Sequence, residues 1–383
     1  MTILAYGFRP FFLLAGLFAT VALPIVLSGD GAPGAWLLGT WHGHEMIFGY
    51  ASAVLSAFLL TAVPNWTGAE PTRGRRLVML VGLWVIGRLA MLLAGHLPPV
   101  AVAVADAVFL LAIMATIGPP LLRAEQRLNA VLLVPIGLLF LANLTIHLDV
   151  ADVIETGAFG GLTAAVHLFA LLITVIGGRI VPSFTINVLR QTTDEAGIRD
   201  NPVFARLSIL GVVLIVVADV IGPMAEIRGI LGLAVAIVIG LRMASWGGWR
   251  TRRQPILWIL HVAYAWLPIG LALEAISRLT DVLPMSGAVH GLTIGAIGTM
   301  TLAMMSRVAL GHTGRPIVLP PWMTVSYVAI TIAAIARIAA PLVDGAYEAL
   351  LMTGTVAWTL AFAIFCVRYG PILTGPRADG KPG

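Results

Sequence analysis

Cysteine and charged residues are scarce in this 383-residue chain. The single cysteine, Cys366, excludes a disulfide or an iron–sulfur cluster built within one chain. Only 11% of the residues are charged, against about a quarter in an ordinary soluble domain, whereas 59% are hydrophobic. This composition excludes a soluble globular protein and indicates a membrane protein. Any metal in it would be held by nitrogen, oxygen or thioether ligands.

Apolar runs recur along the whole chain, each close to the roughly 20 helical residues needed to cross a bilayer. The first run lacks the pattern of a cleaved signal peptide, so we expect it to be a retained helix. We predict an all-α polytopic fold of about twelve helices in a single transmembrane domain, 1–383, with a cytoplasmic loop at about 179–205 between helices 1–6 (about 11–178) and helices 7–12 (about 206–367). The predicted spans are 11–28, 46–63, 77–95, 99–118, 130–148, 158–178, 206–222, 228–245, 257–276, 286–305, 322–340 and 349–367.

The arginines predict the orientation. They follow the predicted helices two, four, six, eight and ten, whereas the intervening loops are neutral or acidic. Basic loop residues stay on the cytoplasmic side, so both termini are expected to be cytoplasmic. The net charge of +5 is scattered over these loops, which argues against nucleic-acid binding. The arginines are Arg73, Arg75, Arg76, Arg123, Arg127, Arg190, Arg199, Arg206, Arg242, Arg250, Arg252, Arg253, Arg307 and Arg315.

The motif WHGHEM at 41–46 places His42, His44 and Glu45 at the start of predicted helix two. Ionisable residues at a membrane boundary are costly unless they bind or move something. Imidazole is the side chain best suited to hold a transition metal or haem iron at neutral pH. Two positions on a regular helix point about 200° apart, so one histidine would ligate haem while the other serves a metal or a carboxylate. The motif therefore predicts a redox or metal centre.

Two further histidines lie at a compatible outer depth. His167 lies deep inside an apolar helix, where its imidazole needs a partner. His290 heads a run in which Gly291, Gly295 and Gly298 form one smooth face, typical either of close helix packing or of a face that receives a flat macrocycle. We predict metal binding by His42, His44, His167 and His290, with His290 as the first choice for an axial haem ligand. His96 and His147, at helix ends, are expected to be interfacial.

Charged and histidine side chains near the predicted cytoplasmic side form a second candidate group. They can hold haem propionates or a second metal through charge-assisted bonds, or simply anchor helix ends. The group consists of Arg179, His261, Arg307, His312 and Arg315. Elsewhere, Arg88 and Asp106 lie at equal depth in a predicted hairpin, so we expect them to form an ion pair.

Four segments resemble the NnrS family of bacterial haem- and copper-containing membrane proteins. They are FRPFFLLAG (8–16), WHGHEMIFGY (41–50), GGRIVPSFT (177–185) and HGLTIGAIGTMTLAMMSRVALGHTGRP (290–316). The resemblance implies a multi-pass protein of the bacterial inner membrane, associated with denitrification and with tolerance of nitric oxide and nitrosative stress. It implies b-type haem and copper, nitric oxide as ligand or substrate, and an electron donor of unknown identity. The family's histidines carry over onto His42, His44, His167, His261, His290 and His312.

Several functions stay open on the sequence. A protein of this kind is a haem-dependent oxidoreductase if it turns nitric oxide over, and a sensor if it only binds it. Haem–copper oxidases also carry histidines on helices two, six and ten, but helix seven here has no histidine pair. A twelve-helix secondary transporter is the other alternative. The segment TGAEPTRGRR at 67–76 resembles the basic loop of major facilitator transporters, but the acidic residue normally found before the arginine and the spacer before the glycine are missing.

The arginine distribution gives a first testable prediction. Reporter fusions placed after Arg76 and after Arg253 should behave as cytoplasmic, because both positions follow even-numbered predicted helices. Alkaline phosphatase and green fluorescent protein fusions measure this directly. Periplasmic signals at both positions would overturn the predicted orientation.

Overall fold

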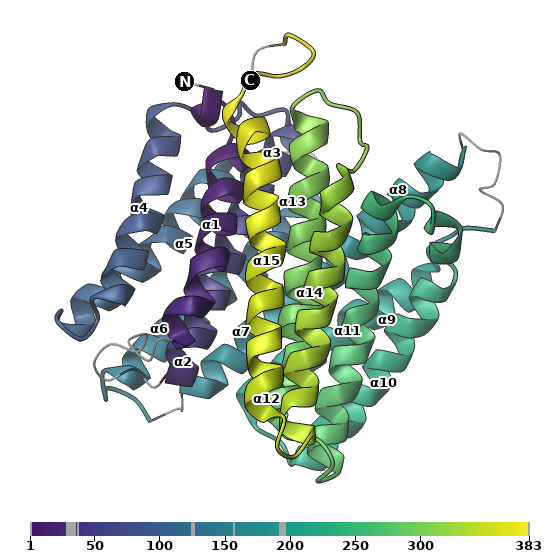
Figure 1. Ribbon diagram of the computed structural model, residues 1–383. Helices are drawn as coiled ribbons and strands as arrows, with labels where there is room; N and C mark the ends of the chain where they lie inside the picture. Colours follow the sequence, from purple (N-terminus) through teal and green to yellow (C-terminus); the bar gives the residue numbers. More distant parts are fainter. Residues whose placement is uncertain are drawn as a thin grey trace. The chain divides into compact units, whose positions relative to one another are not determined.

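The computed structural model describes residues 2–27, 36, 38–123, 127–155, 158–190 and 197–381. These residues form helices and no strand, which confirms the predicted all-α fold (Figure 1). They group into two compact units, and the predicted single domain stays a prediction. Unit 1 comprises Met1–Ala165, Val308–Pro316 and Phe362–Gly383, and unit 2 comprises Val166–Arg307 and Ile317–Ala361.

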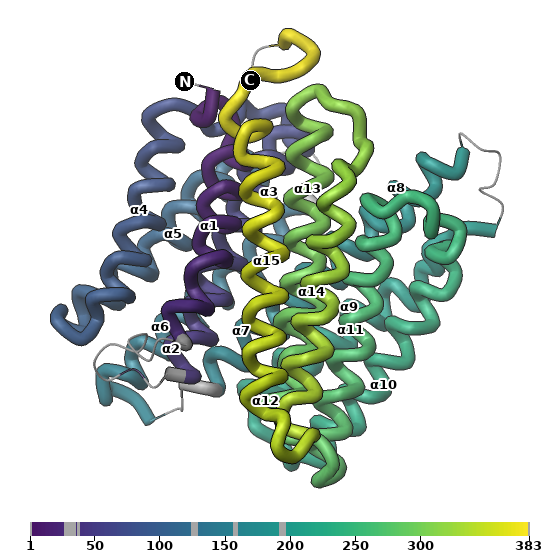
Figure 2. Tube along the Cα trace, viewed as in Figure 1, coloured from purple at the N-terminus to yellow at the C-terminus, as the bar shows by residue number. Residues whose placement is uncertain are grey.

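Unit 1 contains the first five predicted spans and the start of the sixth. Helices α4 and α5 form a hairpin within it and run side by side along the tube in Figure 2. Its helices are η1 (Thr2–Leu4), α1 (Phe8–Leu27), α2 (Leu38–His44), η2 (Glu45–Ala51), α3 (Ser52–Thr67), α4 (Arg75–Leu92), α5 (Pro99–Arg123), η3 (Arg127–Leu132), α6 (Leu133–Val150), the start of α7 (Ala158–Leu172) and the ends of α13 (Thr299–His312) and α15 (Tyr347–Thr374).

Both ends of the chain belong to unit 1 and lie at the same end of it (Figure 1). Arg9 of α1 donates hydrogen bonds to the carbonyl oxygens of Leu373 (2.8 Å) and Gly375 (2.8 Å). An even number of membrane crossings brings the two termini to one side, as the arginine distribution predicts. Assignment of that side to the cytoplasm stays a prediction.

Unit 2 contains the remaining helices. It includes η4 (Ile173–Gly177), α8 (Gly178–Leu189), α9 (Pro202–Ile221), α10 (Ala225–Ala244), η6 (Gly248–Thr251), α11 (Pro255–Leu279), α12 (Met285–His290), η7 (Gly291–Gly298), most of α13 (Thr299–His312), α14 (Pro321–Ala339), η8 (Ala340–Leu342) and the first half of α15 (Tyr347–Thr374). Helices α10 and α11 pack along each other.

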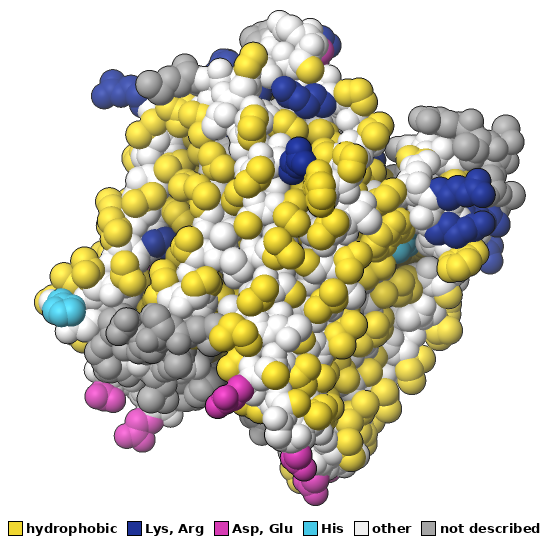
Figure 3. All heavy atoms as spheres, in the orientation of Figure 1, with side chains coloured by type: hydrophobic (Ala, Val, Ile, Leu, Met, Phe, Trp, Pro, Cys, Tyr) yellow, Lys and Arg dark blue, Asp and Glu magenta, His cyan; other side chains and the backbone are white. Residues whose placement is uncertain are grey.

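The predicted spans coincide with these helices. Eleven helices of the described residues are long and apolar enough to cross a membrane, and α4 is a further helix of 18 residues that carries Arg75, Arg76 and Arg88. On the surface drawn in Figure 3, apolar side chains cover most of the helices and charged ones lie mainly near helix ends. The chain is therefore a multi-pass membrane protein.

The predicted boundary that differs most from the structure is the end of the sixth helix. The sixth predicted helix ends at 178, whereas the structure continues it through α8 to Leu189, so the loop begins later than expected. The buried residues of α8 are Gly178, Val181, Pro182, Thr185 and Leu189, a spacing of three to four. The extension is amphipathic, with one polar face, and a search for continuous apolar runs therefore misses it.

Three long spans contain a π-helical turn: η2 after His44, η4 in the span that contains His167, and η7 after His290. In the 18-residue windows of these spans, 83%, 67% and 67% of the residues are buried, the highest values among the eleven. A π turn widens the helix, disturbs its hydrogen-bond ladder and is frequent at functional sites. The spans that bear His44, His167 and His290 are therefore the most buried of the eleven.

Candidate functional site

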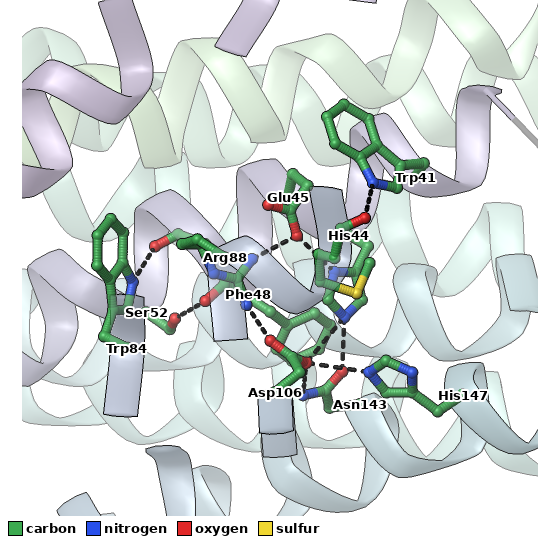
Figure 4. Close-up of polar contacts among 12 residues, drawn as sticks. Trp41, His44, Glu45, Phe48, Ser52, Trp84, Arg88, Asp106, Asn143 and His147 are labelled. Carbon is green, nitrogen blue, oxygen red and sulfur yellow. Dashed lines mark hydrogen bonds and ion pairs between the residues drawn. The ribbon is translucent and has the colours of Figure 1, made fainter. Parts of the chain in front are cut away.

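The WHGHEM motif contains a fully buried histidine, His44. His44 ends α2, and Glu45 begins the π turn η2, so both side chains point into unit 1. His44 Nδ1 lies 3.0 Å from Glu45 Oε1, and its Nε2 lies 2.8 Å from Asn143 Oδ1 and 3.2 Å from Asp106 Oδ2 (Figure 4). Both ring nitrogens of His44 therefore face oxygen atoms.

Arg88 joins the two carboxylates of this cluster. Its guanidinium donates one hydrogen bond to Glu45 and another to Asp106, across the α4–α5 hairpin (Figure 4). The ion pair predicted between Arg88 and Asp106 is confirmed. The Arg88 side chain is 9% exposed, and Glu45 and Asp106 are buried. Water therefore screens these ion pairs little.

His147 completes the cluster from α6. Its Nε2 donates to Asp106 Oδ2 over 3.0 Å, and the Asn143 amide donates to the same oxygen over 2.7 Å. The expectation that His147 is an interfacial residue is wrong, because its side chain is buried. Asn143 and His147 are four residues apart, one turn of α6, and so share a face. A polar pair at this spacing on an apolar helix is the signal that the sequence analysis missed.

These side chains can hold a metal ion. Ligand atoms of His44, Asp106 and His147 all lie within 4.8 Å of one another. Two imidazoles and one carboxylate are a donor set that suits copper, iron or zinc. Trp36 closes one side, with its ring centroid 5.1 Å from that of His44 and 5.3 Å from that of His147. The site is thus built from separate helices and shielded from water.

The hydrogen bonds also fix the charge of the cluster, which we call the His44 cluster (His44, Glu45, Arg88, Asp106, Asn143 and His147). Because both nitrogens of His44 face acceptors, the ring satisfies them only with a hydrogen on each nitrogen. The imidazolium and Arg88 then balance the two carboxylates. A monovalent cation that replaces the Nε2 hydrogen leaves the cluster neutral, whereas a divalent cation leaves it positive.

His42 belongs to α2 like His44, yet it is not part of the group that can share a metal. Its side chain is half-buried. His96 is exposed, as expected of an interfacial residue at a helix end.

His167 lies in unit 2 between two acids. Its Nδ1 is 2.5 Å from Asp219 Oδ2, and its Nε2 is 2.9 Å from Glu274 Oε2. The partner that the sequence required for this imidazole is therefore a pair of carboxylates, from α9 and α11. Ligation of a metal by His167 requires one of the carboxylates to move away.

His290 has different neighbours within unit 2. Its Nδ1 donates to the carbonyl oxygen of Ser286 over 2.7 Å, and its Nε2 accepts from Arg337 over 3.3 Å. Protein fills the glycine face below it: a Cβ added at Gly295 would lie 2.5 Å from Trp266, and one at Gly298 2.8 Å from Trp358. The structure thus uses this face for close helix packing.

The second candidate group is divided between the units. In unit 2, His261 Nε2 lies 2.8 Å from Thr185 Oγ1, and the Arg307 guanidinium stacks 4.1 Å from the Phe184 ring centre. Arg179 is exposed on α8. His312 and Arg315 belong to unit 1. Arg315 donates to the carbonyl oxygen of Thr313, as a residue that anchors a helix end does.

A cleft of about 510 Å³ borders His312 in unit 1, on the side of the chain ends. Tyr6, Phe8, Asn65 and Arg377 also line it. Arg377 donates to both oxygens of the exposed Asp379, and these hydrogen bonds lower the pKa of that carboxyl to about 2. The cleft combines an imidazole, an arginine and aromatic walls, in the size range of small-molecule sites.

A comparison with known families covers nearly the whole chain: the family described as NnrS protein matches residues 2–377. The chain belongs to the NnrS family. A search of curated proteins found no match.

The NnrS match includes both buried clusters and the cleft. It spans His44 and His147 in unit 1, His167 and Glu274 in unit 2, and Arg377 at its last position. The family assignment thus applies to the part of the chain that holds every candidate site. The match names no ligand residues, so the roles of individual histidines rest on geometry.

The ion pairs of the His44 cluster predict a large stability loss on removal of Arg88. Arg88→Met leaves the two buried carboxylates, Glu45 and Asp106, with one cation too few, and should lower the free energy of unfolding by about 3–5 kcal/mol. Arg76→Met, on the exposed part of the same helix, should change it by less than about 0.5 kcal/mol.

Denaturant unfolding in detergent measures both variants. Arg88→Lys, which keeps the charge but loses the two-pronged contact, should give an intermediate loss. If Arg88→Met unfolds like Arg76→Met, the guanidinium does not hold the cluster together.

Proposed function

We propose that this chain is a haem- and copper-containing protein of the bacterial cytoplasmic membrane that binds or processes nitric oxide. It would serve denitrifying metabolism and protection from nitrosative stress. Membership of the NnrS family supports the nitric-oxide-related role at family level. The observation that carries the proposal is the buried group of His44, Asp106 and His147, which can share one metal ion inside an apolar bundle.

The His44 cluster suits cuprous copper best. Replacement of the Nε2 hydrogen of His44 by a monovalent ion keeps the buried charge at zero, and imidazole is a good ligand for copper. His44 and His147 would supply nitrogen ligands and Asp106 an oxygen ligand. Arg88 and Asn143 would hold the Asp106 carboxylate in place, and Glu45 would orient the His44 ring.

Haem suits the cleft at His312 by size and by chemistry. Its volume lies in the range of about 300–1,000 Å³ that is usual for small-molecule sites. His312 offers an imidazole, and Arg377 can exchange the exposed Asp379 for a propionate. The packed glycine face makes His290 the second choice, because a macrocycle there would have to displace Trp266 or Trp358.

When bound, haem iron supplies a position for a diatomic gas, and copper supplies a second redox-active centre. The residues of the chain would control access of water and hold the ligands in place. Trp36 and the apolar helices would exclude water, and Glu45 would hold the hydrogen at His44 Nδ1. Nitric oxide is small, uncharged and soluble in lipid, so it reaches a buried site without a polar channel.

Copper content tests the site. His44→Ala, Asp106→Asn and His147→Ala should each lower copper affinity by about 100-fold or more, whereas the exposed His96→Ala should leave it unchanged. Copper is measured by mass spectrometry on purified protein in limiting metal. Full copper in both histidine variants would refute the site.

Absorption spectra test the haem and the function. The purified protein should show a Soret band that shifts with nitric oxide and is lost or altered in His312→Ala. An altered spectrum in His290→Ala instead would place haem at the outer site. A colourless protein with no bound haem would favour a transporter, and binding without consumption of nitric oxide a sensor.

A further inference from the structure

The loop between α10 and α11 (residues 245–254, SWGGWRTRRQ) carries arginines and tryptophans but no acidic residue. Arg250, Arg252 and Arg253 are exposed, and Trp249 is 79% exposed. Both flanking helices are long and apolar enough to cross a membrane, so the loop lies where the surface of a bilayer would be. Tryptophan is enriched at that depth, because its ring is apolar and its N–H is polar. The loop is therefore placed to meet lipid headgroups.

Inward contacts hold this loop firmly to unit 2. Trp246 is completely buried, donates a hydrogen bond to Asp200 Oδ1 over 3.1 Å, and packs with its ring centroid 4.5 Å from that of Tyr264. Thr251 is also buried, and its hydroxyl donates to the carbonyl oxygen of Gly248 over 2.7 Å. These anchors fix the backbone of the loop. The side chains between and after them are thereby presented outward in a defined arrangement.

Trp249 and Arg252 form one amphipathic pair on the outer side of the loop. The guanidinium of Arg252 lies 5.2 Å from the centre of the Trp249 ring and donates to the carbonyl oxygen of Trp249 over 3.3 Å. A guanidinium offers several N–H groups in a planar fork that matches the oxygens of a phosphate. The pair thus places an apolar ring beside a phosphate-binding group, the same pairing of apolar and charged parts that a phospholipid has.

A further arginine from another segment joins this surface. The Arg199 N–H donates to the carbonyl oxygen of Ser245 over 3.3 Å, and the Ser245 hydroxyl donates back to the carbonyl oxygen of Arg199 over 2.7 Å. Arg199 itself is exposed. Its neighbour Asp200 accepts hydrogen bonds from Arg242 and Trp246, two buried residues. The negative charge of this acid is thus compensated by Arg242, and the arginines on the outer surface keep their positive charge.

We propose that Trp249, Arg252, Arg253 and Arg199 bind the headgroup of an anionic phospholipid at this end of unit 2. The indole of Trp249 lies at the boundary between headgroup and acyl chain, and the guanidiniums donate to the phosphate oxygens. Basic residues at a membrane surface attract anionic lipids. A zwitterionic headgroup carries an ammonium group that cancels the phosphate charge and repels the arginines, so the surface selects anionic lipid. This role goes beyond the proposed function and needs neither copper nor haem.

Fluorescence quenching by brominated lipid tests the proposal on the full-length protein in nanodiscs. Bromine on the acyl chains quenches tryptophan emission only at close range. The chain has 10 tryptophans, so the Trp249 signal is obtained as the difference between each protein and the same protein with Trp249→Phe. Quenching by brominated phosphatidylglycerol, which is anionic, is compared with quenching by brominated phosphatidylcholine, which is zwitterionic, at equal mole fractions.

The ratio of the two quenching constants, phosphatidylglycerol over phosphatidylcholine, should be about 5 or more in the wild type, which corresponds to the attraction of one arginine to an anionic surface. In the double variant Arg252→Gln, Arg253→Gln this ratio should fall toward one. The matched control is Arg75→Gln, Arg76→Gln, which removes the same charge from exposed positions of α4 in unit 1. Its ratio should equal that of the wild type.

Every other outcome overturns the lipid site. Equal quenching by the two lipids in the wild type would make Trp249 an interfacial anchor without headgroup selection, and no quenching by either lipid would place the loop away from the bilayer. An equal fall of the ratio in both double variants would assign the selection to total charge rather than to this loop. The wild-type ratio requires no arginine substitution, so it decides the outcome even where a variant folds poorly. Copper and haem content, measured on the same samples, test the proposed function separately.

Discussion

Charge balance inside an apolar bundle is the constraint on which the candidate sites depend. An isolated carboxylate in hydrocarbon costs several kcal/mol, so each buried acid here has a cation or a hydrogen donor beside it. Arg88 serves Glu45 and Asp106 in unit 1, and Arg228 serves Asp219 in unit 2. In each unit one histidine, His44 or His167, also lies between two acids. Its protonation changes the net charge of the cluster by one. Both units use this same combination.

The two clusters differ in how their donor atoms are arranged around the histidine. In unit 1 a second histidine, His147, turns toward the same carboxylate, so three ligand atoms converge. In unit 2 the acids lie on opposite sides of His167, so its nitrogens diverge toward different partners. Three convergent ligand atoms can share a metal ion, whereas the two carboxylates beside His167 hold its ring between them.

Much of the architecture could be predicted because it depends on patterns along the chain. Hydrophobic runs predicted the helices, and equal depth in a hairpin predicted the pair Arg88–Asp106. His147 was predicted to be interfacial because it lies near the end of its helix. The face of the helix on which it lies, shared with Asn143, was not considered. Asp219 was missed because its contact with His167 spans 52 positions, and no local pattern encodes that. The π turns likewise follow from packing, since their sequences differ little from ordinary apolar helix.

The division into units has a consequence for the order of assembly. All members of the His44 cluster lie between positions 44 and 147, so ribosomal synthesis supplies them early. The cleft needs His312 and Arg377 as well, and unit 1 is complete only when residues 362–383 have been made. Domains tend to fold as their residues emerge. The candidate metal-binding group is thus available early in synthesis, whereas the cleft is complete only once Arg377 has been added to the chain.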